Sequence, residues 1–274
     1  MTTNPLGLPT SYPSRYAPEL LFAIPRTINR NNLGFDAEKL PFLGFDVWRA
    51  YEISWLNLRG KPVVAIGEFV VPCDSPNIVE SKSLKLYLNS LNQTQFFDIA
   101  AVKKLLTDDL SRVAGSTIAV RLFPANHYDE LKVTLPLGRC LDDLDIQVNC
   151  YTPTPQHLKV DANCIISETL YSELFRSNCP VTGQPDWGTI VISYHGPAID
   201  HRGLLAYLVS FRAHEGFHED CVEHVFRDIS TNCATESLQV SINFLRRGGL
   251  EINPIRFSNT YPSSLPSLER FVRQ

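Results

Sequence analysis

Two segments of this chain, 120 positions apart, share a pattern that constrains the fold more than any other feature. A shift of 120 places the segment 84–90 (LKLYLNS) on the segment 204–210 (LLAYLVS). The identical residues in the first copy are Leu84, Tyr87, Leu88 and Ser90. The same shift, without a gap, places Phe97 on Phe217. It also aligns the helical pattern that follows Phe97 with the helical pattern that follows Phe217. A run of matches of this length favours an internal duplication over a chance likeness of two amphipathic units.

Patterns of apolar residues predict strands and helices in both copies. Alternation predicts a strand over 51–58, and the apolar run 63–71 before Pro72 predicts a second. The segments 84–91, 116–123 and 146–151 are also interpreted as strands. Helical spacing over 97–110 places apolar residues on one face: Ile99, Val102, Leu105, Leu106 and Leu110.

The organisation of the chain follows from the duplication and from a few changes in composition. Residues 1–45, rich in Pro, Asn and Arg, are interpreted as an extended N-terminal arm. A first module is expected over 46–151 and a second over 157–274, with the Pro-containing stretch 152–156 as a linker. A chain of 274 residues is long enough for two such modules.

Composition excludes several classes of protein. A net charge of −4 and a pI near 6.0 provide no general attraction to nucleic acid or to anionic membranes. No run of about 18–20 apolar residues is present, as a membrane span requires, and the N-terminus lacks the pattern of a signal peptide. The seven cysteines are scattered without a CxxC pair, which indicates reduced thiols in a cytoplasmic protein.

Cys179 is the most interesting of these cysteines because of the segment around it, 176–188 (RSNCPVTGQPDWG). Two prolines and two glycines predict a loop, where a thiol is more accessible than in a strand or helix. A thiolate is a strong nucleophile once its pKa is lowered. Asp186 follows in the same loop and could donate or accept a proton. By pattern alone, a structural cysteine and an aspartate that braces a turn are the more common interpretations.

Three further segments contain groups that suit a nucleotide-like ligand. His218 and Glu219 come at the predicted start of a helix, where a carboxylate either complements the helix dipole or accepts hydrogen bonds from a purine-like base. The lysines of the segment 80–87 (ESKSLKLY) either discourage pairing at a sheet edge or bind phosphate. The segment 246–249 (RRGG) adds two guanidinium groups beside glycine amides.

The common phosphate and metal motifs do not account for these residues. The sequence contains neither a GxGxxG segment after a strand nor a Walker loop. His214 and His218 are four residues apart, but Gly216 between them argues against a helix that would present both to a metal. We therefore expect no metal site.

The segment 80–87 resembles the signature of the QueF family, the 7-cyano-7-deazaguanine reductases of queuosine biosynthesis. That signature is Glu, Ser or Leu, Lys, Ser or Ala, an apolar residue, Lys, Leu or Tyr, and an aromatic residue, and all eight positions match. Cys179-Pro180, Asp186-Trp187, 217–219 (FHE) and 246–249 also match, in the expected order. The resemblance covers nearly the whole chain and is to the long, two-module form, with the signature in the first module and the cysteine in the second.

The resemblance implies a fold, an activity and a mechanism. The fold would be an α+β tunnelling fold (T-fold), with two tandem modules of antiparallel sheet, helices packed on one face, and assembly into a homodimer. The activity would be NADPH-dependent reduction of the nitrile of 7-cyano-7-deazaguanine to 7-aminomethyl-7-deazaguanine. Cys179 would attack the nitrile carbon to form a covalent thioimide, and Asp186 would donate protons to the nitrogen.

The same resemblance implies which residues bind the substrate and which bind the cofactor. The residues that would hold the deazaguanine are Val79, Glu80, Ser81, His218 and Glu219. Those that would contact NADPH are Ser81, Lys82, Arg247 and Gly248. A carboxylate suits a guanine-like edge because its two oxygens accept from the paired N1–H and N2–H donors.

Two other functions remain compatible with the sequence. One is a hydrolase resembling GTP cyclohydrolase on the same T-fold, which would need a zinc ion held by Cys and His ligands. The other is a purine-binding module in which the cysteine is inert.

Overall fold

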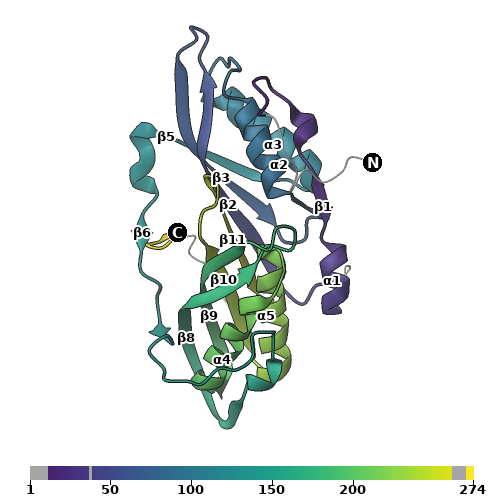
Figure 1. The fold of residues 1–274 in the computed structure, drawn as a ribbon, viewed down its shortest axis with the longest axis vertical. Helices are drawn as coiled ribbons and strands as arrows, with labels where there is room; N and C mark the ends of the chain where they lie inside the picture. Colours follow the sequence, from purple (N-terminus) through teal and green to yellow (C-terminus); the bar gives the residue numbers. More distant parts are fainter. Residues whose placement is uncertain (1–11, 37–38, 261–269) are drawn as a thin grey trace. The chain divides into compact units, whose positions relative to one another are not determined.

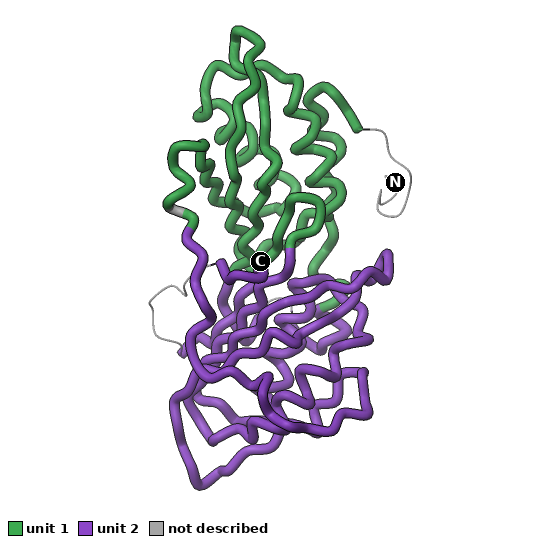
Figure 2. Tube along the Cα trace, turned by 60° about the vertical axis from the view of Figure 1, so that its left-hand side comes forward, with its two compact units in different colours: residues 1–29, 45–131, 246–252 green, residues 30–44, 132–245, 253–274 purple. Residues whose placement is uncertain are grey.

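The computed structural model describes residues 12–36, 39–260 and 270–274, and shows an α+β protein (Figure 1). The chain divides into two compact units (Figure 2). Unit 1 consists of residues 1–29, 45–131 and 246–252, and unit 2 of residues 30–44, 132–245 and 253–274. Each unit therefore contains segments that are far apart in the sequence.

Unit 1 is built on antiparallel strands in the order β5-β3-β2-β11. The strands are β2 (Leu43–Leu56), β3 (Pro62–Pro72), β5 (Ala119–Pro124) and the first residues of β11 (Leu250–Phe257). A short pair, β1 (Ala23–Pro25) with β4 (Asn77–Val79), precedes the helices α2 (Ser81–Ser90) and α3 (Ile99–Ala114). These helices bury apolar side chains against β2, β3 and β5 in one core.

Unit 2 repeats this plan with strands in the order β11-β10-β9-β8-β7. Its long hairpin is β8 (Val160–Asn178) and β9 (Pro185–Ile199), followed by α4 (His201–Ser210), α5 (His218–Cys233) and β10 (Ser237–Phe244). The short β7 (Arg139–Cys140) pairs in parallel with β8. A second parallel pair joins β6 (Val133–Thr134) to β12 (Arg270–Phe271).

Remaining elements are short. Residues 12–45, expected to form an extended arm, contain a 3₁₀ turn η1 (Pro18–Leu20), the strand β1 and the helix α1 (Thr27–Leu33), and belong partly to each unit. Further 3₁₀ turns are η2 (Ala125–Glu130), η3 (Pro155–His157) and η4 (Phe211–Ala213). Residues 1–11 of the predicted arm lie outside the described residues.

The predicted strand over 84–91 is wrong, because this segment belongs to helix α2. Its buried apolar residues recur at helical spacing, at Leu84, Tyr87, Leu88 and Leu91. Glu80 caps the helix: its carboxylate accepts from the backbone N–H of Lys82 at 2.8 Å and of Ser83 at 2.7 Å. In unit 2, Asp200 caps α4 in the same way.

The predicted strand over 146–151 is also wrong, since these residues belong to neither a helix nor a strand. The other predicted elements are confirmed with shifted ends. The strand predictions over 51–58, 63–71 and 116–123 correspond to β2, β3 and β5, and the helical pattern over 97–110 corresponds to α3.

Hydrogen bonds between the two helices of each unit support the duplication. The Tyr87 hydroxyl donates to Asp109 Oδ2 at 2.7 Å, and the Tyr207 hydroxyl donates to Asp228 Oδ2 at 2.8 Å. The first helices correspond at a shift of 120, but Asp109 and Asp228 are 119 apart. The 16-residue helices α3 and α5 also begin 119 apart. The gapless alignment of the sequence is therefore off by one residue in the second helix.

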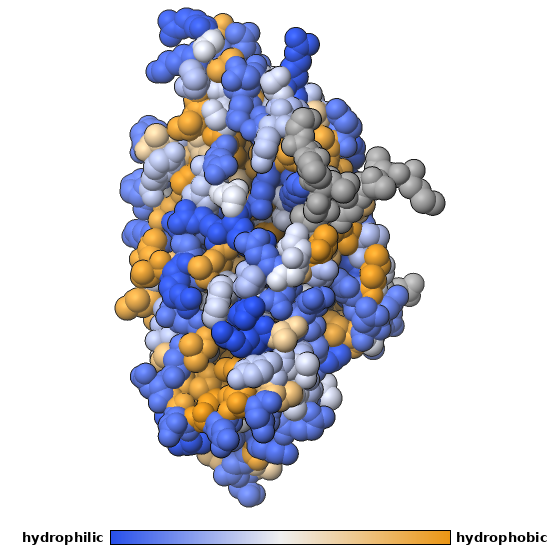
Figure 3. All heavy atoms as spheres, in the orientation of Figure 1, coloured by the Kyte–Doolittle hydropathy of each residue, from blue (hydrophilic) through white to orange (hydrophobic). Residues whose placement is uncertain are grey.

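The surface carries no broad apolar band on the face drawn in Figure 3, where hydrophobic residues form small groups among hydrophilic ones. Exposed apolar residues of the described chain include Phe97, Leu135 and Leu137. Within the part of the chain that the structure describes, we find no helix that combines the length and the apolar character needed to cross a membrane.

Candidate active site

Cys179 lies in the turn that joins β8 to β9 in unit 2. Its backbone N–H donates to Gln184 O at 2.9 Å, and its carbonyl accepts from Gly183 N at 2.9 Å. Gly183 has a φ of 67°, which a glycine adopts without strain. The turn holds the thiol partly exposed directly after the last residue of β8. The predicted loop at Cys179 is confirmed, but two details of that prediction are wrong. Cys164, on β8, is more exposed than Cys179, and Asp186 lies on β9 and not in the loop.

Asp186 is buried close to this turn. It lies on β9 opposite Ser177, two residues before Cys179, and is only 4% exposed. Its Oδ2 is 3.6 Å from Nε2 of His218, the first residue of α5. A buried carboxylate needs such partners, because an unpaired charge in this environment is costly. The structure thus brings together two of the predicted site residues, Asp186 and His218.

The orientation of the His218 ring is set by Phe244, which the sequence analysis did not identify. The two rings stack with centroids 3.8 Å apart and planes at 7°. Gly188 makes room for this pair: a Cβ there would lie 2.8 Å from Ile242 Cγ2 and 3.3 Å from Phe244 Cδ1. A larger residue at position 188 would therefore require the side chains of Ile242 and Phe244 to shift.

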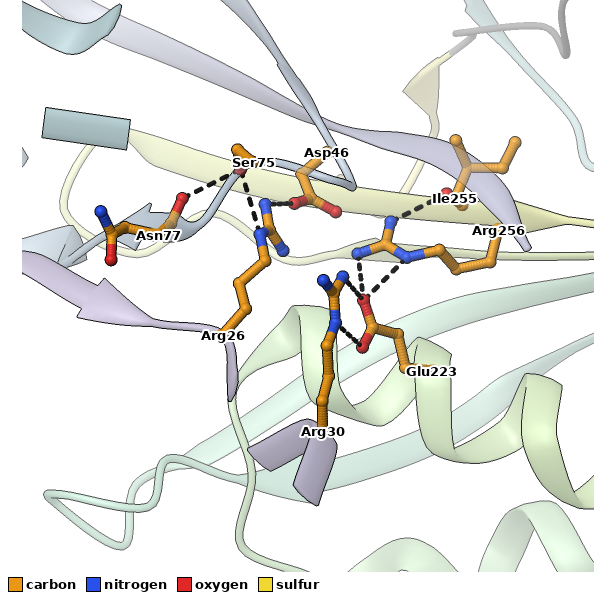
Figure 4. Close-up of polar contacts among 8 residues, drawn as sticks. All are labelled: Arg26, Arg30, Asp46, Ser75, Asn77, Glu223, Ile255 and Arg256. Carbon is orange, nitrogen blue, oxygen red and sulfur yellow. Dashed lines mark hydrogen bonds and ion pairs between the residues drawn. The ribbon is translucent and has the colours of Figure 1, made fainter. Parts of the chain in front are cut away.

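Glu219 follows His218 and is 3% exposed, in the first turn of α5. One turn further along the helix, Glu223 fixes α5 to other parts of unit 2. It accepts from Arg30 Nη2 at 2.7 Å and from Arg256 Nη2 at 2.8 Å, as Figure 4 shows. Charged groups buried in this way are stable only as a hydrogen-bonded set. The set locks the helix that carries His218 and Glu219.

The segment before α5 supports the end of β8 through backbone contacts. His214 O accepts from Asn178 N at 2.8 Å, and Asn178 O accepts from Gly216 N at 3.1 Å. Burial lowers the pKa of His214 to about 4, with a smaller contribution from the charge of His224. The imidazole of His214 is therefore neutral at physiological pH.

The predicted cofactor residues lie in unit 1, and one of them contacts the signature helix. A Cβ on Gly248 would lie 3.5 Å from Nζ of Lys85, and one on Gly249 would lie 2.5 Å from Cδ of Glu52. These residues line a small cavity of about 70 Å³ with Asn89 of α2. Lys85 was not among the predicted cofactor contacts, although it belongs to the same eight-residue motif.

Basic groups and glycine backbone in this part of unit 1 fit a phosphate-bearing cofactor. Arg246 stacks over the Tyr51 ring at 4.3 Å, and Arg247 begins the tight turn through the two glycines. Lys82 lies in the first turn of α2. A glycine backbone allows close approach of a phosphate, and cations complement its charge.

Val79, Glu80 and Ser81 meet at the start of α2. Val79 and Glu80 are 4% and 2% exposed, and both carboxylate oxygens of Glu80 accept backbone N–H groups of the helix. The Ser81 hydroxyl lies 3.5 Å from Glu80 Oε1. The carboxylate therefore has a structural task as the cap of α2. Among the described residues, no group of three or more His, Cys, Asp or Glu side chains is arranged to hold a metal ion.

Comparisons with known proteins identify the family of this chain. A family model described as "Nitrile reductase, 7-cyano-7-deazaguanine-reductase N-term" matches residues 12–122, and one described as "QueF-like protein" matches residues 185–262. The chain belongs to the QueF family of nitrile reductases.

Similar proteins cover almost the whole chain. A protein of Azoarcus sp. (strain BH72) is 53% identical over 93% of this chain and 91% of its own length. A protein of Dechloromonas aromatica (strain RCB) is 52% identical over 99% of this chain and 95% of its own. Both are named NADPH-dependent 7-cyano-7-deazaguanine reductase. A solved structure, of apo archaeosine synthase QueF-Like, covers 38% of this chain at 16% identity and a TM-score of 0.31.

Proposed function

We propose that this chain reduces the nitrile of 7-cyano-7-deazaguanine to the primary amine 7-aminomethyl-7-deazaguanine with NADPH, as a step of queuosine biosynthesis. Membership of the QueF family and relatives named for this reaction support the proposal. The structural observation that carries it is the turn in which a partly exposed Cys179 follows the strand position paired with buried Asp186.

Cys179 serves as the nucleophile in this proposal. Its Sγ adds as the thiolate to the nitrile carbon, one π bond of the C≡N group breaks, and the nitrogen receives a proton from the Asp186 carboxyl group. The product is a covalent thioimide, whose C=N bond accepts hydride more readily than the nitrile, so that one difficult step becomes several easier ones. His218, in contact with Asp186, can return a proton to it.

Glu219 is proposed to recognise the deazaguanine. Its carboxylate, held by a helix that Glu223 anchors, can accept from the two N–H donors on the guanine-like edge. His218 and the Val79–Ser81 segment complete the proposed substrate contacts. The capping bond from Ser83 N leaves the second lone pair of Glu80 Oε2 for such a contact.

NADPH is the proposed cofactor. Each NADPH would supply one hydride when bound, so reduction of the nitrile to the amine would consume two NADPH molecules in succession. Ser81, Lys82, Arg247 and Gly248 are proposed to contact it. The proximity of Gly248 to Lys85 supports this assignment and adds Lys85 as a candidate contact. Arginine and lysine close to a glycine turn suit the additional phosphate that distinguishes NADPH from NADH.

We propose in addition that each unit is a T-fold module and that the chain forms a homodimer. The order of two strands, two helices and further antiparallel strands in both units supports the first part. The second part is testable by light scattering coupled to size exclusion. A mass of one chain would contradict it.

Intact-mass spectrometry tests the activity and the nucleophile together. Incubation with 7-cyano-7-deazaguanine and no NADPH is expected to add the whole mass of the substrate to the protein, because thioimide formation is an addition. The Cys179→Ala variant should show no adduct, whereas Cys164→Ala, a change at an exposed cysteine, should keep it. An adduct that survives Cys179→Ala would refute the mechanism.

A further inference from the structure

A second cavity, of about 400 Å³, opens in unit 1 at the start of α3. Its lining includes Ile99 and Ala100 from the first turn of the helix, and Lys103 one turn later. From the other side come Arg121 and Pro124 of β5 and His127 of η2. The residues that line this cavity include none of those assigned to the nitrile reductase activity.

The position of this cavity in the duplicated fold corresponds to that of the candidate active site. At the shift of 119 that relates α3 to α5, Ile99 and Ala100 correspond to His218 and Glu219. In the strands, Pro124 pairs with Ala65 as Phe244 pairs with Gly188. Two residues earlier on the same strands, Val63 corresponds to Asp186.

The turn that holds Cys179 has a counterpart as well. In unit 1, Asn57 N donates to Lys61 O at 2.9 Å, and Asn57 O accepts from Gly60 N at 2.9 Å. Cys179 makes the same two bonds with Gln184 and Gly183. Asn57 therefore stands at the place of the nucleophile. All four groups proposed for chemistry in unit 2 are absent from the corresponding positions of unit 1.

The side chains around the cavity in unit 1 favour an anion. Lys103 and His127 are exposed, and the Arg121 guanidinium lies 4.7 Å over the Phe123 ring. Arg121 also contacts Glu68 at 3.3 Å, but Glu68 accepts a shorter bond, of 2.8 Å, from Arg49. Ile99 and Ala100 stand in place of His218 and Glu219. The carboxylate at this helix start, Asp98, caps α3 by accepting from Ala101 N at 2.8 Å and is not among the residues that line the cavity.

We propose that this cavity binds the phosphate group of a small molecule. Lys103 and Arg121 supply charge-assisted hydrogen bonds, the His127 ring offers a further hydrogen bond, and Phe123 and Pro124 supply apolar surface for the rest of the ligand. Inorganic pyrophosphate and a nucleoside monophosphate share this chemistry. The apolar wall favours the nucleotide, because pyrophosphate makes no use of it.

Isothermal titration calorimetry of the full chain with pyrophosphate, AMP and adenosine distinguishes these ligands. Pyrophosphate and AMP are expected to bind, AMP more tightly, and adenosine not at all. Lys103→Gln and Arg121→Gln should each weaken binding roughly tenfold, as loss of a charge-assisted contact does. Lys104→Gln is the matched control, since Lys104 follows on the same helix but pairs with Asp108.

Ala100→Glu separates binding from folding. It restores a carboxylate where unit 2 has Glu219, at a helix start where an acidic residue is favourable, so thermal unfolding should be unchanged or slightly raised. Binding of AMP should nevertheless fall at least tenfold through charge repulsion. All these variants should retain the wild-type KM for NADPH and the wild-type rate of nitrile reduction.

Several outcomes would overturn the proposal. Absence of AMP and pyrophosphate binding, or binding that Lys103→Gln and Ala100→Glu leave unchanged, would show that the cavity is not a phosphate site. A raised KM for NADPH in these variants would assign the cavity to the cofactor instead. Binding of adenosine equal to that of AMP would show that the phosphate group is not recognised.

Discussion

Units 1 and 2 have closely similar scaffolds but different side chains at the positions proposed for the chemistry. Both have a glycine-containing turn between the first two strands, a capped first helix and a tyrosine–aspartate bond between the helices. In unit 2 the equivalent positions carry Cys179, Asp186, His218 and Glu219. In unit 1 they carry Asn57, Val63, Ile99 and Ala100.

This difference indicates that the same backbone scaffold can present different functional side chains in this fold. The turn and the helix start determine where a side chain is presented, and the residue type determines what it does there. Unit 2 carries the proposed nucleophile and the proposed acid, whereas unit 1 has cations at a cavity in the corresponding place. The comparison can be tested by exchanging residues between equivalent positions.

The largest expected effect comes from the nucleophile. Cys179→Ala should lower the rate of NADPH oxidation with the nitrile by on the order of 10⁴-fold or more, as removal of a covalent nucleophile does. Asn57→Cys in the same background places a thiol in the equivalent turn, without an equivalent of Asp186, and should not restore activity. Recovery of turnover in the double variant would show that the turn alone is sufficient.

Asp186→Asn is expected to have the next largest effect. The amide matches the carboxyl group in shape but cannot act as a general acid, so kcat should fall by about 10²–10⁴-fold. Substrate KM should change much less. Asp108→Asn, at an exposed residue of unit 1, is the control. Full turnover of Asp186→Asn in steady-state kinetics would remove Asp186 from the proposed mechanism.

Titration of His214 should make the stability of unit 2 depend on pH. Its counterpart in unit 1, Thr94, does not titrate and makes no such contribution. Burial lowers the pKa of His214 to about 4 from the 6.5 of an unfolded chain. The unfolded state therefore binds the proton first, and stability present above pH 6.5 is lost as the pH falls toward 4, by at most about 3 kcal/mol.

Urea unfolding at a series of pH values measures this dependence. His214→Gln should flatten the profile between pH 6.5 and 4, because the glutamine does not titrate. The control is Thr94→Ala, which should leave the pH profile unchanged. Thr94 is the counterpart of His214, because its carbonyl accepts from Leu56 N as the carbonyl of His214 accepts from Asn178 N. Identical profiles for wild type and His214→Gln would contradict the assignment.

The smallest expected effect concerns the strand contact behind His218. Gly188→Ala should lower the free energy of unfolding by about 1–3 kcal/mol, since the new methyl group overlaps Ile242 and crowds Phe244. Unit 1 has Ala65 at this position, and Ala65→Gly should cost about 0.5–1 kcal/mol as a glycine in a strand does. Equal losses in urea unfolding would mean that the two strand pairs are equally tolerant.

Local patterns in the sequence predicted much of this structure. The strands around 51–58 and 63–71 and the helix after Phe97 follow from apolar periodicity, which depends only on neighbours along the chain. The signature segment and the loop around Cys179 indicated the family, and the comparisons confirm it. The segment 84–91 was misread because it fits two patterns: Leu84, Leu86 and Leu88 alternate as in a strand, whereas Leu84, Tyr87, Leu88 and Leu91 recur at helical spacing.

By itself, the sequence of this protein determined the duplicated plan, the family and the identity of the groups available for chemistry. Only the tertiary structure decided that Phe244 stacks on His218, that Glu223 anchors the helix of Glu219, and that α3 and α5 correspond with a one-residue shift. These contacts join residues far apart in the chain. They depend on strand register and helix packing, which a local pattern does not encode.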